Sequence, residues 1–211
     1  MPEGGIPRPL SPLDHEDRLR GRGHSWIAGV DEVGRGPLAG PVVAAAVILP
    51  AGEWIEGAGD SKAIRAIRRI QLAYEIRARA RAVGVGAASV AEIDRLTIAG
   101  ATALAVERAL AALSQTPDHV ILDGRPMRRL SWPHEAVVGG DALVHSVGCA
   151  SIVAKVVRDE LMGRLGERYP GYGWRRNAGY GTAEHMEAIQ ELGITPHHRR
   201  SFAPVRLRLE M

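Results

Sequence analysis

Acidic residues stand at or near the ends of three predicted strands. They are Asp31, Glu32, Asp123 and Asp141, each preceded by apolar residues and followed closely by glycine. Adjacent strand ends in an α/β sheet converge on one crevice, so we expect these carboxylates to lie together. Such a cluster repels itself, and its pKa values rise unless cations neutralise it. Oxygen donors without histidine or cysteine partners suit Mg²⁺ or Mn²⁺ rather than Zn²⁺, and two such ions can assist a phosphodiester displacement.

A simpler interpretation makes these residues turn acids, because Asp-Gly is a common short turn signal. Taken alone, Asp123 fits that interpretation better than a catalytic one. The pair Asp31 and Glu32 fits it less well, since charged residues are seldom buried inside an apolar strand without a role. Adjacent strand residues point to opposite faces, so either the strand is irregular there or only one of the two is a direct ligand.

A glycine-rich loop, Gly34-Arg35-Gly36, follows the first acidic pair, with Gly40 beyond it. Such a loop could cradle a phosphate, or it could be a fragment of a dinucleotide-binding fingerprint. The fingerprint requires a helix directly after the loop, whereas Pro37 and Pro41 interrupt here and Val42–Leu49 predicts a strand. We therefore favour a third interpretation, in which the glycines and the single arginine allow backbone N–H groups of the loop to approach a nucleic-acid backbone closely.

Basic residues are concentrated between Ser61 and Ala82, where Glu75 is the only acid. They are Lys62, Arg65, Arg68, Arg69, Arg77, Arg79 and Arg81. A solvated helix face usually mixes both signs, so this stretch favours phosphate contacts, with Lys62 and the following arginines as candidates. The formal charge of +3 permits a polyanionic partner without requiring one, and the general preference for arginine also fits a bias in base composition.

Five strands are predicted, at Ser25–Val33, Pro41–Leu49, Ala82–Ala88, His119–Leu122 and Glu135–Val138. Helices are predicted after a cap at Ser61, after Ser89, from Thr97 to Leu113, from about Ser146 to Arg168, and from Thr182 to about Leu192. In the first of these helices, Ile67, Ile70 and Tyr74 share one face. Strands followed by alternation and then helices indicate an α/β fold with a mixed sheet flanked by helices.

The chain has 211 residues, 45% of them hydrophobic, which is enough for one good-sized core. We divide it into a mobile N-terminal tail (1–23), a catalytic core (24–168) and a C-terminal loop and helical extension (169–211). No apolar run is long enough to span a membrane, and the first residues lack a signal-peptide core. Cys149 is the only cysteine, which suits a reducing cytoplasm.

Several of these segments resemble the ribonuclease HII family. The stretch from Ala28 to Val43, with the sequence AGVDEVGRGPLAGPVV, is very similar to that family's opening signature. Further matches are Asp60-Ser61-Lys62, Ile121–Gly124, Gly140-Asp141 with Ala150–Asp159, Tyr169–Gly173, Gly179–His185 and His198–Phe202. The resemblance runs from about Ile27 to Pro204. The chain departs from it in two places: Gly139 stands where the family usually has lysine, and Gly148-Cys149 where it usually has alanines.

This resemblance implies a ribonuclease H-like fold, with a mixed five-stranded sheet, surrounding helices and a C-terminal helical extension. It implies that Asp31, Glu32, Asp123 and Asp141 bind Mn²⁺ or Mg²⁺ and catalyse hydrolysis. The expected substrates are RNA–DNA hybrids and duplex DNA containing ribonucleotides, cut to leave 5′-phosphate and 3′-hydroxyl ends. By analogy, Gly34-Arg35-Gly36 senses the ribose 2′-hydroxyl and Tyr180 stacks on the deoxyribose that follows. We expect a cytoplasmic monomer.

Other residues admit plainer interpretations. Tyr180 could be an aromatic anchor in its loop, although the glycines on either side deny it packing neighbours. Lys155 and Arg158 share a predicted helix with Asp159, which favours surface ion pairing. Ser151 could be a small contact between helix and sheet. The histidines at positions 185, 197 and 198 lack metal-ligand spacing and indicate caps or surface residues.

Two alternatives to a ribonuclease of this family remain open. The first is a nucleic-acid-binding module that keeps the basic surface without turnover, which the presence of all four carboxylates argues against. The second is a resolvase or another ribonuclease H-like nuclease, which the combination of Gly34-Arg35-Gly36 with Gly179-Tyr180-Gly181 argues against. The sequence ranks neither the two metals nor single ribonucleotides against long hybrids.

Overall fold

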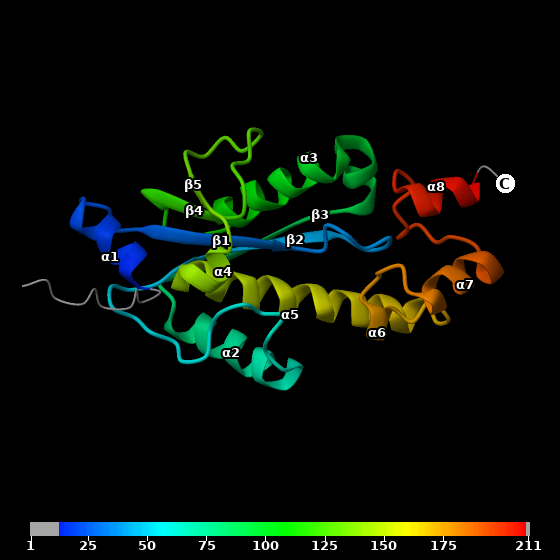
Figure 1. Ribbon diagram of the computed structural model, residues 1–211, viewed down its shortest axis with the longest axis horizontal. Helices are drawn as coiled ribbons and strands as arrows, with labels where there is room; N and C mark the ends of the chain where they lie inside the picture. The colour runs from blue at the N-terminus through cyan, green and yellow to red at the C-terminus, as the bar shows by residue number, and fades with distance from the viewer. Residues whose placement is uncertain (1–12, 210–211) are drawn as a thin grey trace, which may run out of the picture.

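The structure, a computed structural model, describes residues 13–209. A five-stranded mixed sheet lies at its centre, in the order β3-β2-β1-β4-β5 (Figure 1). The strands are β1 (Ile27–Val33), β2 (Val42–Ile48), β3 (Ala82–Ala88), β4 (His119–Asp123) and β5 (Glu135–Val137). Antiparallel pairing joins β1 to β2 and β2 to β3, whereas β4 runs parallel to both β1 and β5. The predicted strands and mixed sheet are confirmed.

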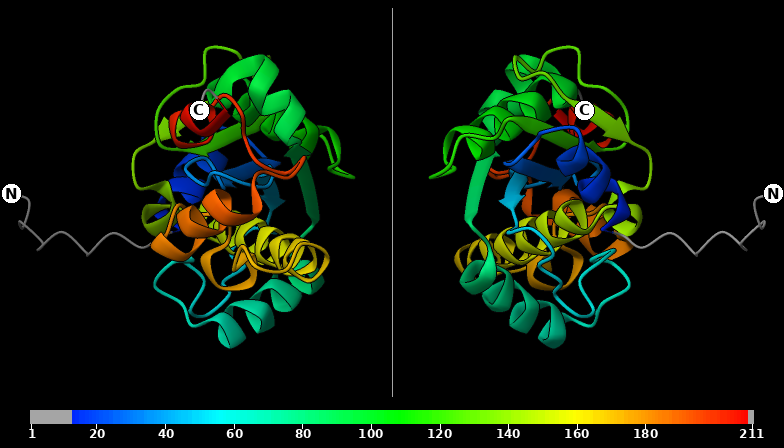
Figure 2. Two further views of the ribbon diagram at one scale, coloured as in Figure 1. Left: turned by 90° about the vertical axis from the view of Figure 1, so that its right-hand side faces the viewer. Right: turned by 90° about the vertical axis from the view of Figure 1, so that its left-hand side faces the viewer.

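Helices cover both faces of this sheet (Figures 1 and 2). They are α1 (Asp14–Gly21), α2 (Ala66–Arg79), α3 (Val90–Ala111), α4 (Gly140–Leu143), α5 (His145–Arg168), α6 (Trp174–Asn177), α7 (Ala183–Leu192) and α8 (Ala203–Leu209). One face carries α3 and the other α5, with α2 outside α5; α6, α7 and α8 gather beyond one end of the sheet. No helix within residues 13–209 is long and apolar enough to cross a membrane.

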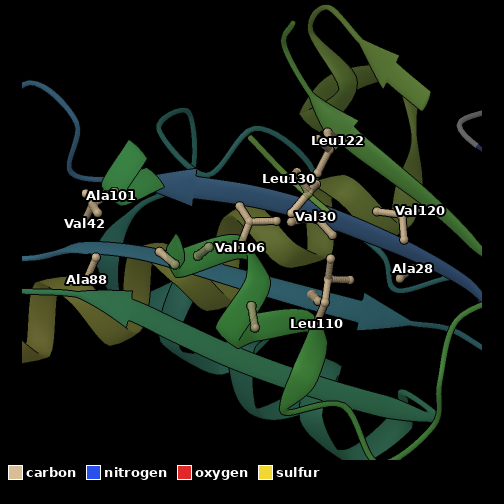
Figure 3. Packing of buried hydrophobic residues seen from close by; sticks show 14 of the residues in the cluster. Ala28, Val30, Val42, Ala88, Ala101, Val106, Leu110, Val120, Leu122 and Leu130 are labelled. Atoms are coloured by element: carbon tan, nitrogen blue, oxygen red, sulfur yellow. The ribbon is translucent and has the colours of Figure 1, made fainter. Parts of the chain in front are cut away.

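Small residues in the strands allow the helices to approach the sheet closely. A Cβ added at Gly29 of β1 would lie 2.3 Å from the main chain of Ser146 in α5. A Cβ at Gly86 of β3 would lie 2.2 Å from the carbonyl oxygen of Ala105 in α3. The core between the sheet and α3 includes Val30, Val106, Leu110 and Leu122 (Figure 3). Because both faces are covered, β2 is apolar throughout instead of alternating.

The break predicted inside the third helical segment is present. Ser89 caps α3 and forms a capping box with Glu92. At Thr97 the backbone leaves the helical region, with φ 67° and ψ 163°, before the longer part of the helix begins. The sequence prediction of a short helix followed by one that opens at Thr97 is therefore confirmed.

Residues 1–23 were predicted to be a mobile tail, whereas much of their described part is a helix packed on the core. Residues Asp14–Gly21 form α1, and Leu19 is buried against the core. Glu16 is buried too, and its carboxylate accepts hydrogen bonds from the main-chain N–H of Ser146 at 2.9 Å and from its hydroxyl at 2.8 Å. These contacts lie 130 residues away along the chain, beyond the reach of a local pattern. Residues 1–12 are outside the described part of the chain.

The predictions for α2 are wrong in two respects. Its cap is Arg65, not Ser61, which is instead buried beside α5. Its predicted inner face, Ile67, Ile70 and Tyr74, is exposed, and the residues that face the core are Leu72, Ala73 and Ile76. Two apolar stripes at helical spacing lie on this helix. The stripe that packs against α5 is the one that contains Ala73, whose side chain is smaller than any in the exposed stripe.

Candidate active site

Asp31 and Asp123 lie on the same face of two adjacent parallel strands. β1 and β4 pair in register from Ile27 with His119 to Val30 with Leu122, so the two aspartates occupy the next positions. Pairing of β1 with β2 continues regularly through Asp31 and Glu32. The strand is therefore regular, and alternation turns only Asp31 toward the face that α5 and Asp123 share.

The Glu32 side chain is oriented by Arg35 of the glycine-rich loop. Arg35 donates a hydrogen bond to its carboxylate at 3.0 Å, and this arginine is itself 54% exposed at the surface. The charge of Asp123 still raises the pKa of Glu32, although burial is the main cause of that rise. Glu32 is thus within electrostatic range of the other carboxylates while it orients the arginine of the glycine-rich loop.

Asp141 lies in the first turn of α4, beside Asp123. The main-chain N–H of Gly140 donates to Asp123 Oδ1 at 2.7 Å and so ties α4 to the end of β4. Burial raises the pKa of Asp141, and the charges of Asp123 and Asp60 raise it further, whereas Lys62 opposes them. The structure therefore brings Lys62 next to the carboxylates, and it adds Asp60, which the sequence analysis did not assign to the site.

Asp31 is the most perturbed of these acids. Burial raises its pKa to about 7, and the charges of Glu32 and Asp123 act in the same direction, against a hydrogen bond from the Ser151 hydroxyl. The Ser151 and Ser61 hydroxyls lie 2.9 Å apart. A hydroxyl has one proton, so both contacts are satisfied when Ser61 donates to Ser151 and Ser151 donates to Asp31. Ser151 therefore supports a carboxylate as well as packing helix against sheet.

The chemistry of this donor set fits a hard divalent cation. Asp31, Glu32, Asp123 and Asp141 offer only oxygen, and three of them have pKa values raised by burial and mutual repulsion. Both effects disfavour the ionised carboxylates, and a bound cation would offset both. Within residues 13–209, no three His, Cys, Asp or Glu side chains are already closed into a metal-binding group. The carboxylates are neighbours, and a cation would have to draw them closer.

The glycine-rich loop and Tyr180 adjoin each other beside this cluster. A Cβ added at Gly36 would lie 3.5 Å from Cε1 of Tyr180. Arg35 and Gly36 are exposed, and the Tyr180 side chain is 48% exposed, so its ring is open to a ligand. Gly34 has a φ of 92° and sits against Arg158, which leaves no room for a side chain. After the loop comes β2 and not a helix, which excludes a dinucleotide-binding fingerprint.

Two buried histidines, His185 and His198, fix the main chain of Tyr180 through hydrogen bonds. His185 Nδ1 lies 2.9 Å from the Tyr180 carbonyl oxygen, so this nitrogen carries the proton. His185 Nε2 then accepts from Trp174 at 3.0 Å and from His198 Nε2 at 3.1 Å. His198 Nδ1 in turn accepts from the N–H of Thr195 at 2.9 Å. Both rings are neutral in this arrangement, and the prediction that they are caps or surface residues is wrong.

The predicted basic surface is smaller than the sequence indicates. Arg69 is largely buried and donates to the carbonyls of Ser61 and Ile64 and to Asp159. Arg79 binds Glu53 and Glu75. By contrast, the exposed side chains of Lys62, Arg65 and Arg77 have no hydrogen bond or ion pair with any residue in the described part of the chain. We therefore take these three as candidate phosphate contacts.

A mixed five-stranded sheet with acidic residues at the adjoining ends of β1 and β4 defines the class of ribonuclease H-like nucleases. Comparison with known proteins narrows this class. The Ribonuclease HII family matches residues 28–205. Ribonuclease HII of Ruegeria pomeroyi is 56% identical over 90% of this chain and 81% of its own, and that of Synechococcus sp. (strain JA-3-3Ab) is 53% identical over 96% and 93%. The chain belongs to the ribonuclease HII family, whose members are metal-dependent endoribonucleases.

Solved structures agree with this assignment. The ribonuclease H2 of Pyrococcus horikoshii superposes with a TM-score of 0.75 at 27% identity, covering 88% of this chain and 97% of its own. The RNase HII in a complex with PCNA from Archaeoglobus fulgidus gives 0.69 at 26% identity, covering 82% and 93%. A Bst-RNase HIII in complex with Mn²⁺ gives 0.70 at 22% identity over 88% and 69%, which supports the fold alone.

The two departures from the family pattern have different structural settings. Gly139 caps α4 with a φ of 72°, a left-handed conformation that favours glycine. At Gly148 an added Cβ would lie 2.7 Å from the carbonyl oxygen of Asp141 and 3.0 Å from Cα of Gly59. The glycine at position 148 thus lets α5 approach the segment that carries Asp141.

Proposed function

We propose that this protein is an endonuclease that hydrolyses the RNA phosphodiester of RNA–DNA hybrids and of ribonucleotides embedded in duplex DNA, leaving 5′-phosphate and 3′-hydroxyl ends. The observation that carries the proposal is the placement of the carboxylate cluster beside a surface formed by Gly34-Arg35-Gly36 and Tyr180. A metal-binding cluster supplies hydrolysis, and the adjoining surface supplies a means of selecting ribose.

The proposed ligands of two Mg²⁺ or Mn²⁺ ions are Asp31, Glu32, Asp123 and Asp141. Bound there, such ions would reduce the repulsion between the anionic phosphodiester and the attacking water-derived nucleophile, and would activate that water. The chain itself keeps the ligands oriented: Ser151 hydrogen-bonds to Asp31, and the N–H of Gly140 holds Asp123. Lys62, close to Asp141, is proposed to meet a phosphate of the substrate.

Selection of the cutting site is proposed to use the two adjoining loops. The 2′-hydroxyl is the group that distinguishes RNA from DNA, and the exposed main chain of Arg35 and Gly36 can form hydrogen bonds to it. The exposed ring of Tyr180 offers a flat apolar face to the next sugar, which favours one without a hydroxyl. Together these contacts would prefer a ribonucleotide followed by a deoxyribonucleotide.

The proposed working form is a cytoplasmic monomer. All the carboxylates and both substrate loops come from one chain, so the site does not need a second copy. The single cysteine, Cys149, is buried and free, which suits a reducing compartment.

The direct test is incubation with a DNA duplex that carries one ribonucleotide, with Mn²⁺, with Mg²⁺ and with EDTA. We expect a single cut at the ribonucleotide, with ends bearing 5′-phosphate and 3′-hydroxyl, and no cut in EDTA. An all-DNA duplex of the same sequence is the control and should stay intact. Tight binding without cleavage under every metal condition would instead support a binding module.

A further inference from the structure

Two arginines lie beneath the substrate loops, and both are completely buried. Arg158 of α5 and Arg199, which follows α7, are each 0% exposed. Neither guanidinium lies within ion-pair distance of a carboxylate in residues 13–209. A buried charge without a counter-charge is costly, so an arrangement with two of them calls for an explanation. Surface ion pairing with Asp159 was predicted for Lys155 and Arg158; it is confirmed for Lys155, at 2.6 Å, and wrong for Arg158, which is buried.

Arg199 donates only to main-chain carbonyls of the glycine-rich loop. Its Nε and Nη2 reach the carbonyl of Gly40 at 3.0 and 2.9 Å, its Nη1 reaches that of Arg35 at 2.9 Å, and Nη2 also bonds the carbonyl of Gly34. The carbonyls of residues 34 and 35 are thereby turned inward. In a trans peptide the N–H points opposite to the carbonyl of the same unit. The N–H groups of Arg35 and Gly36 therefore point outward.

These two N–H groups are available for a ligand. Neither donates to any acceptor in the described part of the chain, and both residues are exposed. The carbonyl of each peptide unit accepts from a guanidinium, which polarises the unit and strengthens its N–H as a donor. Two adjacent outward N–H groups of this kind can donate together to an oxygen ligand.

Arg158 connects the same loop to the Tyr180 segment. Its three nitrogens donate to the carbonyls of Pro41 at 3.0 Å, Ala39 at 3.2 Å and Ala178 at 3.0 Å. Ala178 has a left-handed backbone, with a φ of 49°, which is unfavourable for a residue with a side chain. The bond to Arg158 helps to hold it there, two residues before Tyr180.

We propose that Arg199 and Arg158 are positioning residues for ribonucleotide recognition. Arg199 presents the N–H groups of residues 35 and 36 to the ribose 2′-hydroxyl or its phosphate, and Arg158 sets the distance from these donors to Tyr180. Their charges, which form no ion pair within residues 13–209, also attract the phosphates of the duplex. The inference rests on the proposed function, because it explains how the two loops select ribose.

The test compares the binding of two matched duplexes in EDTA, one with a single ribonucleotide and one entirely of DNA. Wild type should prefer the ribonucleotide duplex. Arg199→Lys keeps a cation but cannot form all four hydrogen bonds of the guanidinium, so the preference should fall about tenfold, as expected for one or two lost hydrogen bonds, with little change for the DNA duplex. Arg200→Lys is the control, because this neighbour is exposed, and it should retain the preference. A preference unchanged in Arg199→Lys would overturn the inference.

Wild-type measurements decide the matter if Arg199→Lys does not fold. Amide hydrogen exchange at Arg35 and Gly36 should be fast in the free protein and slowed by the ribonucleotide duplex, but not by the DNA duplex. Protection already present in the free protein, or none with the ribonucleotide duplex, would contradict the inference. A wild type that cleaves yet shows no preference in EDTA contradicts the inference alone. A wild type that neither cleaves with Mn²⁺ nor prefers ribose contradicts the proposed function.

Discussion

Asp31 is buried against α5 with two other acids nearby, and its ionised form is disfavoured there. Its pKa, raised to about 7, is nearly the same as the pH at which the enzyme would work. Above that pH the folded protein must bury a negative charge that the unfolded chain exposes to water. A bound divalent cation would reverse the sign of this effect, because it interacts favourably with the same charge.

Asp31→Asn should therefore stabilise the metal-free protein and inactivate it. At pH 8 in EDTA we expect the melting temperature to rise by about 5 °C, since the buried charge is removed. Added Mn²⁺ should raise the melting temperature of wild type more than that of the variant, and cleavage should be lost while hybrid binding remains. Asp17→Asn, on the surface of α1, is the control. A less stable Asp31→Asn protein in EDTA, or one with near-wild-type turnover, would contradict this role.

Tyr180 gives a second prediction for a single residue. Stacking of its ring on a sugar contributes on the order of 1–3 kcal/mol by analogy with base stacking, so Tyr180→Ala should lose roughly one to two decades in rate on a single embedded ribonucleotide. A uniform hybrid should suffer less, and Tyr180→Phe should retain activity because the ring does the stacking. Rates of all three proteins on both substrates are the measurement. Equal losses on the two substrates would make Tyr180 a structural residue.

Single residues also show how far the sequence alone could lead. Asp31, Asp123 and Asp141 were predictable as neighbours, because apolar runs that end in acids mark strand ends. Arg158 and Arg199 were not predictable as buried cations. Their acceptors are main-chain carbonyls, which every residue has, and those bonded to Arg199 lie about 160 residues earlier in the chain. No spacing of residue types records such a contact.

At the scale of elements, α2 shows the limit of periodicity. The spacing of apolar residues predicts a helix correctly, but Ile67, Ile70 and Tyr74 and the stripe with Leu72 and Ile76 satisfy the period equally well. Which stripe is buried depends on the neighbouring helix α5, whose small residues allow close packing of Ala73 and the residues beside it. A helix pattern thus predicts an element more securely than it predicts which side of that element is buried.

The contact between His185 of α7 and His198 predicts a pH dependence of stability. Burial lowers the pKa of His198 to about 4, and the unfolded chain titrates near 6.5, so between these values only the unfolded state takes up the proton. Stability from this residue is complete above pH 6.5 and is lost as the pH falls toward 4. The stability advantage of wild type over His198→Gln should therefore shrink by about 1 kcal/mol or more from pH 7 to pH 4.5.

Urea unfolding of both proteins at several pH values measures that difference, and groups common to both cancel. The comparison is needed because the raised pKa of Asp31 has the opposite effect on the total. An advantage that stays constant across this range would mean that His198 is not held neutral in the folded protein.

At the scale of the whole molecule, the exposed cations near α2 that have no ion pair within residues 13–209 are candidate sites for phosphates. Arg65→Glu should weaken binding to hybrid and DNA duplexes alike and flatten the log–log dependence of affinity on salt by roughly one unit. Arg128→Glu, an exposed position in the loop between β4 and β5, is the charge-matched control. Arg69 is unsuitable for this test because its guanidinium ties α2 to Ser61 and Asp159. An unchanged slope for Arg65→Glu would mean that the cations near α2 face solvent and do not contact phosphates.

The length of α5 has a consequence for the substrate. The helix has 24 residues, which at 1.5 Å each makes it roughly 36 Å long. Ser151, in its second turn, touches Asp31, whereas its last turns pack against α6 and the C-terminal extension. From Ser151 to Arg168 this rigid helix extends about 17 residues, or roughly 26 Å, and so separates the cutting centre from the C-terminal extension by about three-quarters of a duplex turn, roughly eight base pairs. The length of α5 therefore fixes the distance between the cutting centre and the C-terminal extension. Shortening the duplex below that length beyond the cut should weaken binding, although every group that contacts the cut is still in place.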